Sequence, residues 1–295
     1  MKRGKKGVAF AAGAAAAAAM TAWAAWENRA LTVQSISVTE TNLPQAFSGF
    51  RIAHISDFHN EEFSGGNEKP LRLLKKISPD IVVITGDLID SRHTEVEISA
   101  DFVRRISAFA PVYYVPGNHE SRIPEAYRSL KAMLAEAGVC VLENDAQYIE
   151  RDGERIQIIG VRDPDFYTLE NPENPKGSWD PGFSGGERLL IETNDLRDSG
   201  VFSILLSHRP EFFDFYVRSG VNLVFAGHAH GGQFRIPFAG GLFAPGQGFF
   251  PKYDAGLYRE GNTSMIVSRG MGRSLVPLRL HNRPEIIAAQ LVRGG

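Results

Sequence analysis

Five short apolar runs in this chain each end in side chains that bind metals or carry protons. The runs span residues 51–56, 81–85, 112–115, 202–207 and 224–226, and they lead to Asp57 and His59, Asp87 and Asp90, Asn118 and His119, His208, and His228 and His230. Short apolar runs of this kind predict buried strands. Because ligands of open α/β sheets gather at the carboxyl ends of strands, we expect these side chains to meet at one site. Solvated loops would not repeat this arrangement five times.

The last run ends in two histidines that are two residues apart. Gly227 stops the strand, and residues two apart in an extended chain share a face, so His228 and His230 should point the same way. Neighbouring imidazoles are costly as cations and useful as metal ligands. The alternative is a polar loop with solvated histidines, which would be the better explanation for this pair alone. The other four strand ends favour a metal site.

The order of periodic segments predicts a mostly parallel α/β fold. Apolar residues at helical spacing in 71–77 and 98–109 lie between strand-like runs, and this repeated β-α-β pattern implies right-handed crossovers. Later, Asp152-Gly153 separates two strand-like runs and predicts a hairpin. Residues 163–186 lack periodicity and predict a long loop beside the site. Two sheets covered by helices would account for this order, with no separate second domain.

The strand-end motifs follow the order DxH, GDxxD, GNHE, a lone His and GHxH. This order resembles the calcineurin-like metallophosphoesterase family over residues 50–232, without a substitution at a ligand position. Further stretches look like the membrane-associated bacterial phosphodiesterases of the YaeI/YkuE type: 227–233, 237–240, 268–272, 277–279 and 284–286. The resemblance implies a four-layer α/β/β/α sandwich of two mixed β-sheets flanked by helices.

The candidate donors are oxygen and nitrogen atoms without thiolates. Such a set suits divalent Mn, Fe or Zn, with Mn favoured. Seven donors are too many for one tetrahedral ion and suit two ions that share a ligand. By resemblance, Asp57, His59, Asp87 and His230 hold one metal, Asp87, Asn118, His208 and His228 hold the other, and Asp87 bridges them.

Residues beside the ligands have expected roles as well. The resemblance makes His119 the general acid for the leaving oxygen, and Asp90 would orient and charge it. Asp90 could instead cap the following helix. Glu120 is expected to be a solvated charge, and Arg209, beside a ligand, is a candidate for binding a phosphate oxygen.

The remaining histidines and the single cysteine have simpler explanations. We expect His54, within a strand, to be packed or to support a ligand, and His281, in a polar turn, to be solvated. His93 follows Asp90 in a loop and could touch substrate. Cys140 lies in an apolar run and is expected to be a small buried hydrophobe; with one cysteine, no internal disulfide can form.

The N-terminus predicts export from the cytoplasm. Residues 1–7 are basic, and residues 8–26 form an uncharged run of 19 residues, 12 of them Ala. This run is either a signal peptide or an uncleaved membrane anchor, and the basic end should stay cytoplasmic. Trp23 and Trp26 favour the anchor. Residues 27–50 should supply a linker and a first strand, and 51–295 the catalytic domain.

These expectations converge on an enzyme of the cell envelope. We expect a monomer that hydrolyses a phosphodiester or pyrophosphate bond by metal-activated water, on a lipid-linked or other cell-envelope substrate. The net charge of −2 gives no general attraction to nucleic acid. Two alternatives remain open: a membrane-anchored metal-binding scaffold without turnover, and a dinuclear hydrolase that acts on another bond, such as an amide.

Overall fold

The computed structural model describes residues 21–24, 26–63, 65–170, 185–273 and 278–295. The basic residues 1–7 and most of the apolar run 8–26 lie outside these ranges, as do residues 171–184 of the expected loop and residue 277. Within the part that is described, no helix has both the length and the apolar character needed to span a bilayer.

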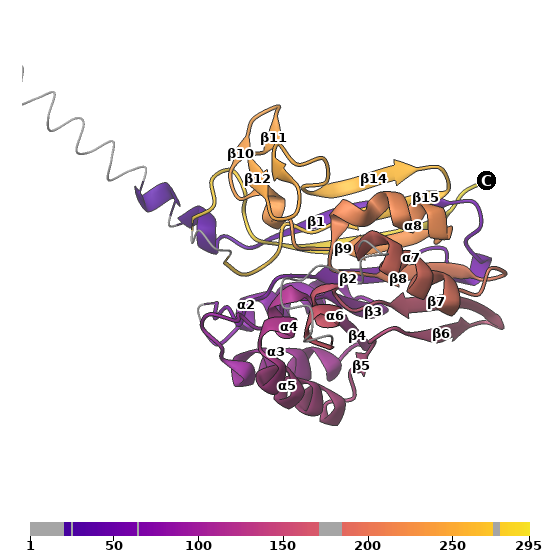
Figure 1. Ribbon diagram of the computed structural model, residues 1–295, viewed down its shortest axis with the longest axis horizontal. Coiled ribbons are helices and arrows are strands. Elements are labelled where there is room, and N and C mark those ends of the chain that lie inside the picture. Colours follow the sequence, from indigo (N-terminus) through magenta and orange to yellow (C-terminus); the bar gives the residue numbers. More distant parts are fainter. Residues whose placement is uncertain (1–20, 25, 64, 171–184, 274–277) are drawn as a thin grey trace, which may run out of the picture.

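Two six-stranded sheets form the middle of the molecule (Figure 1). The first has the order β1 (Thr32–Glu40), β16 (Glu285–Arg293), β2 (Arg51–Ile55), β3 (Ile81–Thr85), β4 (Val112–Val115) and β5 (Cys140–Val141). The second has the order β14 (Gly256–Glu260), β15 (Thr263–Val267), β9 (Leu223–Ala226), β8 (Phe202–Leu206), β7 (Glu154–Gly160) and β6 (Asp145–Arg151). Neighbouring strands are mostly parallel; β16 with β2, β14 with β15, and β6 with β7 are antiparallel. The β6–β7 pair is the hairpin expected at Asp152-Gly153.

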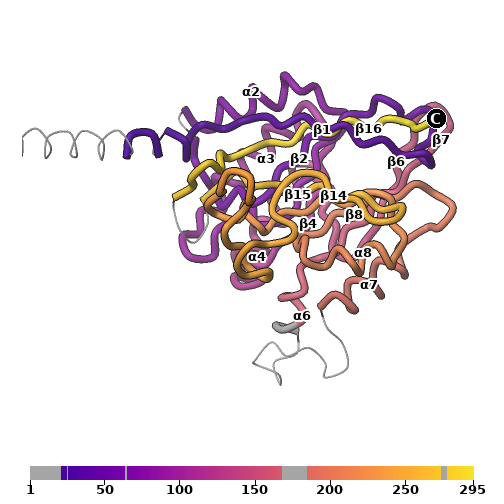
Figure 2. Tube along the Cα trace, turned by 90° about the horizontal axis from the view of Figure 1, so that it is seen from above, coloured from indigo at the N-terminus to yellow at the C-terminus, as the bar shows by residue number. Residues whose placement is uncertain are grey.

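Helices cover the outer faces of both sheets (Figures 1 and 2). Helices α2 (Glu68–Ile77), α3 (Val96–Ser107) and α5 (Pro124–Glu136) pack on the first sheet, and α7 (Gly185–Leu196) and α8 (Phe213–Ser219) on the second. The central strands are apolar on both faces because both are buried. In β3, Val82 and Ile84 face the helices, whereas Ile81 and Val83 face the other sheet. The expected four-layer α/β/β/α sandwich is confirmed.

The segment before Arg51 belongs to the sandwich. Strand β1 pairs in parallel with β16 along its whole length. After it, Leu43, Phe47 and Phe50 are buried between the sheets, where the short helix η1 (Gln45–Phe47) turns the chain. The folded domain therefore begins before Arg51, and the strand expected in residues 27–50 is a structural part of it.

A short helix lies in the described part of the long loop expected at residues 163–186. Helix α6 (Asp165–Glu170) begins after Asp163, whose carboxylate accepts a hydrogen bond from the backbone N–H of Asp165 at 2.9 Å. An Asp that accepts such a bond favours the start of a helix. The Asp-Pro-Asp sequence at residues 163–165 was the local signal for it.

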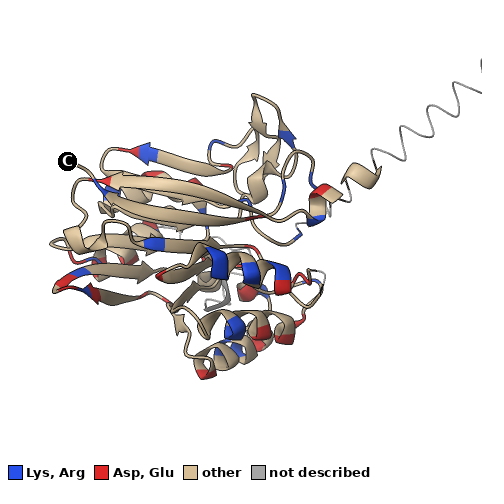
Figure 3. Cartoon of the chain, turned by 180° about the vertical axis from the view of Figure 1, so that it is seen from behind, with Lys and Arg blue, Asp and Glu red and all other residues tan. Residues whose placement is uncertain are grey.

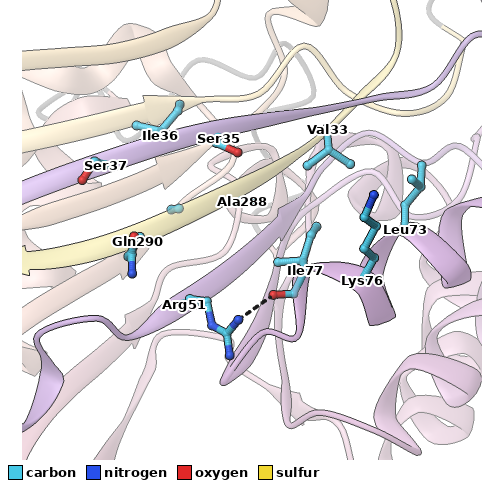
Figure 4. A pocket seen from close by; sticks show the side chains of 11 residues that line it. Val33, Ser35, Ile36, Ser37, Arg51, Leu73, Lys76, Ile77, Ala288 and Gln290 are labelled. Atoms are coloured by element: carbon cyan, nitrogen blue, oxygen red, sulfur yellow. Dashed lines mark hydrogen bonds between the residues drawn. The ribbon is translucent and has the colours of Figure 1, made fainter.

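A groove of 650 Å³ lies on the outer face of the first sheet, beside α2 (Figure 4). Figure 4 shows Ser35 and Gln290 from β1 and β16 on one side and Ile77 from α2 on the other. Its charged lining residues are Arg51 and Lys76, and none of the lining residues is His, Asp or Glu. The groove therefore lacks the carboxylates and imidazoles that make up the candidate metal ligands.

Residues that follow β1 should contribute to global stability. We expect Leu43→Ala to lower the free energy of unfolding by roughly 2–5 kcal/mol, because Leu43 is fully buried between the sheets. The control is Val33→Ala on the groove face of β1, which should cost less than about 1 kcal/mol because Val33 is exposed. Urea unfolding of both variants measures the difference. Equal midpoints would show that residues 32–50 are not part of the cooperative core.

Candidate metal centre

The carboxyl ends of five strands meet at one edge of the sandwich. Asp57 and His59 follow β2, Asp87 follows β3, Asn118 follows β4, His208 follows β8, and His228 and His230 follow β9. Hydrogen bonds join the two sheets here: His208 Nδ1 donates to the carbonyl oxygen of Thr85 at 2.7 Å, and the N–H of His228 lies 3.1 Å from Asp57 Oδ2. The structure thus brings together all seven residues expected as metal ligands; that they bind metal stays a prediction.

Asp57, His59 and His230 form the first group of donors. His230 Nε2 lies 3.3 Å from Asp57 Oδ1 and 3.3 Å from His59 Nε2. One ligand atom from each residue lies within 4.8 Å of the others. All three side chains are buried and have little contact with bulk water.

Asp87, Asn118, His208 and His228 form the second group. His208 Nε2 lies 3.3 Å from Asp87 Oδ2, 3.1 Å from Asn118 Oδ1 and 3.1 Å from His228 Nδ1. Because Nδ1 of His208 donates to Thr85, Nε2 is left to face the donors. His228 presents Nδ1 to the group, and its buried Nε2 has no hydrogen-bond partner among the described residues.

Asp87 lies between the two groups. Its Oδ2 is 3.3 Å from His208 Nε2 and 3.7 Å from His59 Nε2. Its Oδ1 accepts a hydrogen bond from the backbone N–H of His119 at 2.9 Å. A carboxylate in this position is within reach of both groups, as the expected bridging role requires.

Burial keeps three of the imidazoles neutral. It lowers the pKa of His59 to about 4 and holds the pKa values of His228 and His230 well below their ordinary value. Neutral imidazole is the form that binds a metal ion.

The buried carboxylates of Asp57 and Asp87 carry charge that a cation would compensate. Within the described ranges, neither Asp57 nor Asp87 forms an ion pair with Lys or Arg. Burial raises the pKa of Asp57 to about 6. Burial acts in the same direction on Asp87, but the charges of His208, His119 and His59 and a hydrogen bond with His208 together lower the Asp87 pKa. Burial would lower the pKa of His208, but Asp87, helped by the charges of Asp57 and Asp163, raises it to about 10. A proton on His208 thus supplies the positive charge that a divalent cation would supply instead, so the donor set fits such an ion.

Five of the seven candidate ligands have left-handed backbone. The φ angles are 51° at Asp57, 49° at His59, 53° at Asp87, 62° at His228 and 46° at His230. This conformation is uncommon for residues other than glycine and clusters at functional sites. The strain places side chains from sharply turning strand ends toward a common point.

Gly117 and Gly227 allow the strand ends to approach each other. A Cβ atom on Gly227 would lie 1.7 Å from Ser56 Oγ and 2.5 Å from Asp57 Oδ2. A Cβ atom on Gly117 would lie 2.3 Å from Asp87 Oδ1. Neither residue has a positive φ, so the requirement is for space rather than for a left-handed turn.

His119 faces the donors with one ring nitrogen. The N–H of Ser91 donates to its Nδ1 at 3.0 Å, so neutral His119 carries its proton on Nε2, which lies 4.0 Å from Asp87 Oδ2. Asp90 Oδ1 is 3.6 Å from Nδ1, but the Asp90 carboxylate also accepts three bonds from Arg92. Burial lowers the pKa of His119, and the carboxylates of Asp87 and Asp90 oppose that shift. Asp90 does not cap the following helix, α3, whose N-cap residue is Glu95.

The expectation for Glu120 was wrong, because its side chain is fully buried. Its carboxylate accepts backbone N–H bonds from Gly117 at 2.7 Å, Asp87 at 2.9 Å and Ile89 at 3.1 Å. It thus joins the turn after β3 to the first turn of α4 (Asn118–Arg122). The Glu at the third position of a helix was the signal, since such residues often accept bonds from helix N-termini.

Arg209 does not point a free guanidinium at the site. It donates to Asp163 at 2.6 and 3.0 Å, and Asp165 lies 2.9 Å away. These carboxylates raise its pKa further against the effect of burial. The expected contact with phosphate is therefore replaced by an anchor for the start of α6.

The other histidines lie apart from the donors. His54 is buried, with Nε2 2.8 Å from Thr85 Oγ1, and burial lowers its pKa to about 3. His93 and His281 are exposed. Cys140 is half-buried in β5.

A cavity of 200 Å³ opens onto the donors. Its lining includes two arginines that the motifs did not identify, Arg92 and Arg122. They lie two residues after Asp90 and Glu120, on the segments that leave the strand ends. Pro245 also lines the cavity.

The segment 268–272 supports the Asp57 turn from the C-terminal end of the chain. The N–H of Met271 donates to Ser56 and that of Gly272 to Asp57, at 3.0 and 2.7 Å. Nearby, the guanidinium of Arg279 donates to the carbonyl oxygen of Gly272 at 2.7 Å. This segment thus holds the backbone that delivers the first donor group.

Comparison with known proteins agrees with this geometry. Residues 50–232 match the model of the family described as calcineurin-like phosphoesterase. The chain belongs to this family. It is 32% identical over 257 residues to YkuE of Bacillus subtilis, an uncharacterized metallophosphoesterase, with 85% of this chain and 82% of YkuE covered. It is 27% identical over 252 residues to the phosphodiesterase YaeI of Escherichia coli, with 82% of each protein covered.

These relatives confirm the resemblance to the YaeI/YkuE-type subgroup. Together with the donor groups, family membership makes the chain a metal-dependent phosphoester hydrolase with a candidate dimetal centre.

Gly272 should be needed for metal binding. A Cβ atom there would lie 2.1 Å from the carbonyl oxygen of Phe58, so we expect Gly272→Ala to displace the Asp57 turn, lower metal content and destabilise the fold by roughly 1–3 kcal/mol. The control is Gly200→Ala, whose Cβ atom would have ordinary contacts. Elemental analysis and thermal unfolding provide the two readouts. Full metal content and stability in Gly272→Ala would contradict the close packing.

Proposed function

We propose that this enzyme is a phosphodiesterase that cleaves a lipid-linked or other cell-envelope phosphodiester or pyrophosphate. The observation that carries the proposal is the convergence of seven donors around Asp87, with the Nε2–H of His119 facing the same point. The relative YaeI, named a phosphodiesterase, supports the diester. Two divalent ions, with Mn preferred over Fe or Zn, would neutralise phosphate oxygens and lower the pKa of the attacking water.

The side chains at the site would bind the two ions and protonate the leaving group. Asp57, His59, Asp87 and His230 would hold one ion, and Asp87, Asn118, His208 and His228 the other. In its protonated form, His119 would donate its Nε2 proton to the leaving oxygen and return to neutral imidazole. Asp90 Oδ1, 3.6 Å from Nδ1, would stabilise the protonated ring, and the N–H of Ser91 holds Nδ1 of the neutral ring.

Arg92 and Arg122, on the cavity wall, would bind the phosphate or its ester group. The apolar segment 234–250, which continues from the His230 turn, suits a substrate with a lipid portion.

A non-catalytic scaffold is the competing function. It would bind metal without turnover and would not need His119. The ring of His119 is half-enclosed beside the donors and held by Ser91, an arrangement that favours turnover.

Metal content and turnover should separate the ligands from the acid. With Mn²⁺ added, the full chain should hydrolyse an aryl phosphodiester. Asp87→Asn should lose metal at both positions because Asp87 is shared between the donor groups. His119→Ala should keep its metal and lose about 10²–10⁴-fold in kcat. The loss should shrink when the leaving group is a weak base that needs no proton.

His93→Ala is the matched control, since His93 is exposed and outside the cavity lining. Loss of metal in His119→Ala to the extent seen in Asp87→Asn would show that the role assignment is wrong. A wild-type chain that holds metal but cleaves no phosphoester would favour the scaffold.

We also propose that the domain lies outside the cytoplasm, held by residues 8–26. The proposal rests on the basic residues before this run and on Trp23 and Trp26 at its end. Protease added to intact spheroplasts should degrade the domain, and full protection would refute the orientation. A soluble product that begins near residue 25 would refute the anchor alone.

A further inference from the structure

Two small hairpins follow the His230 turn and display aromatic side chains to solvent. Strand β10 (Arg235–Ile236) pairs with β11 (Gly240–Gly241), and β12 (Phe243–Ala244) pairs with β13 (Gly248–Phe249). Phe238, at the tip of the first hairpin, is fully exposed, and Phe249 and Phe250 are 72% and 62% exposed. Phe243 packs on Phe249 across the second hairpin, with ring centroids 5.4 Å apart.

The N-terminal helical residues continue this apolar surface. Trp23 lies 5.1 Å from the His281 ring, and Arg283 lies over the ring of Trp26. The same C-terminal segment bonds to the first hairpin, because the N–H of Arg235 donates to the carbonyl oxygen of Leu280. In Figures 1 and 2, the hairpins and the described N-terminal residues lie at the same end of the molecule, away from the C-terminus.

Exposed apolar side chains are concentrated at this end. Among the described residues, twelve large hydrophobic side chains are exposed, and eight belong to this surface, which we call the aromatic surface: Trp23, Trp26, Ile236, Phe238, Phe243, Phe249, Phe250 and Leu278. The other four are scattered over β1, α5, β6 and α7. A soluble face rarely gathers so many apolar groups without a partner.

We propose that the aromatic surface lies in the headgroup region of a lipid bilayer. Three observations favour a bilayer over a protein partner. Trp and Phe at the level of the headgroups are typical of membrane-contacting surfaces. Trp23 and Trp26, from the described end of the uncharged run 8–26, contact the His281 ring and Arg283 at this surface. Residues 234–253 contain no Asp or Glu, and their two cations, Arg235 and Lys252, lie within 3.0 and 3.9 Å of the carboxylates of Asp254 and Asp214, so the hairpins carry little net charge that a bilayer surface would have to desolvate. Figure 3 shows the hairpins as largely uncharged.

This contact would place the metal centre next to the headgroups. Pro245 in the second hairpin is both part of the loop between β12 and β13 and part of the cavity wall. The hairpins follow directly on η3 (His230–Gly232). The proposal does not depend on which phosphoester is cleaved.

The test uses the full chain with vesicles of phosphatidylcholine and phosphatidylglycerol. In a Cys140→Ala background, an environment-sensitive fluorophore is attached to a single new cysteine, either Phe238→Cys or Phe249→Cys. The control position is Tyr148→Cys on β6, because Tyr148 is exposed but lies outside the aromatic surface. The first two labels should shift to the blue and be quenched by nitroxide lipids, and the control should do neither. No shift at either position on vesicle-bound chain overturns the proposal, and so does a chain that fails to float with the vesicles.

A second variant separates bilayer contact from self-association and from the anchor. In Phe238→Ser/Phe249→Ser/Phe250→Ser, a label at Ile236→Cys should lose the blue shift that it shows with the three Phe residues in place, while the thermal midpoint is kept. Retention of the shift would mean that the N-terminal run alone sets the contact. A shift without vesicles that grows with protein concentration would assign the surface to a second copy of the chain, and would overturn the proposal.

Discussion

Two carboxylates, Asp57 and Asp87, are buried where two sheets meet, and no Lys or Arg pairs with either in the described ranges. Isolated charges in such a place are costly unless a cation or hydrogen bonds compensate them. Imidazoles surround both carboxylates, and burial keeps most of these rings neutral. The arrangement therefore favours added positive charge, which a proton on His208 or a metal ion would supply. The need to compensate the two buried carboxylates accounts for the imidazoles around them. The two packed sheets bring these side chains together at one edge.

The sandwich must hold these donors in an unfavourable backbone. Left-handed conformations at Asp57, Asp87 and His228 each cost of order 1–3 kcal/mol and persist only where the surroundings fix them. Glu120 fixes one turn through three backbone N–H groups, and segment 268–272 fixes another through its bonds to Ser56 and Asp57. The site therefore depends on chain segments more than 200 residues apart in sequence, since Asp57 and Gly272 hold each other in place.

The sequence predicts well which side chains meet at this edge of the sandwich, because strand ends are visible in it. An apolar run followed by Asp, Asn or His is a local pattern, and parallel strands bring such ends together without further information. It predicts the surroundings of Glu120 and Arg209 poorly, because the identity of a charged residue does not reveal whether its side chain is solvated or has a buried partner. Glu120 is bonded to three backbone groups from two turns, and Arg209 to carboxylates near residue 163, and both sets of contacts exist only in the folded chain. The place of β1 was also hidden, since its partner β16 lies at the other end of the sequence.

The exposure of the aromatic side chains in the hairpins is also poorly predicted from the sequence. Aromatic residues in 234–250 are visible in the sequence, but their exposure is not, because apolar letters usually mark a core. The structure shows how the hairpins that carry these rings are connected to the site. Gly232 packs closely on Gly241: a Cβ atom on Gly232 would lie 2.3 Å from the Cα atom of Gly241. The backbone N–H of Leu242 donates to the carbonyl oxygens of Gly232 and Phe234. The hairpins are thereby tied to the turn that carries His230 and directed outward from it. A short backbone connection thus sets the distance between the metal centre and any surface that the aromatic rings contact, so the fold that gathers the donors also determines from which side a substrate can approach them.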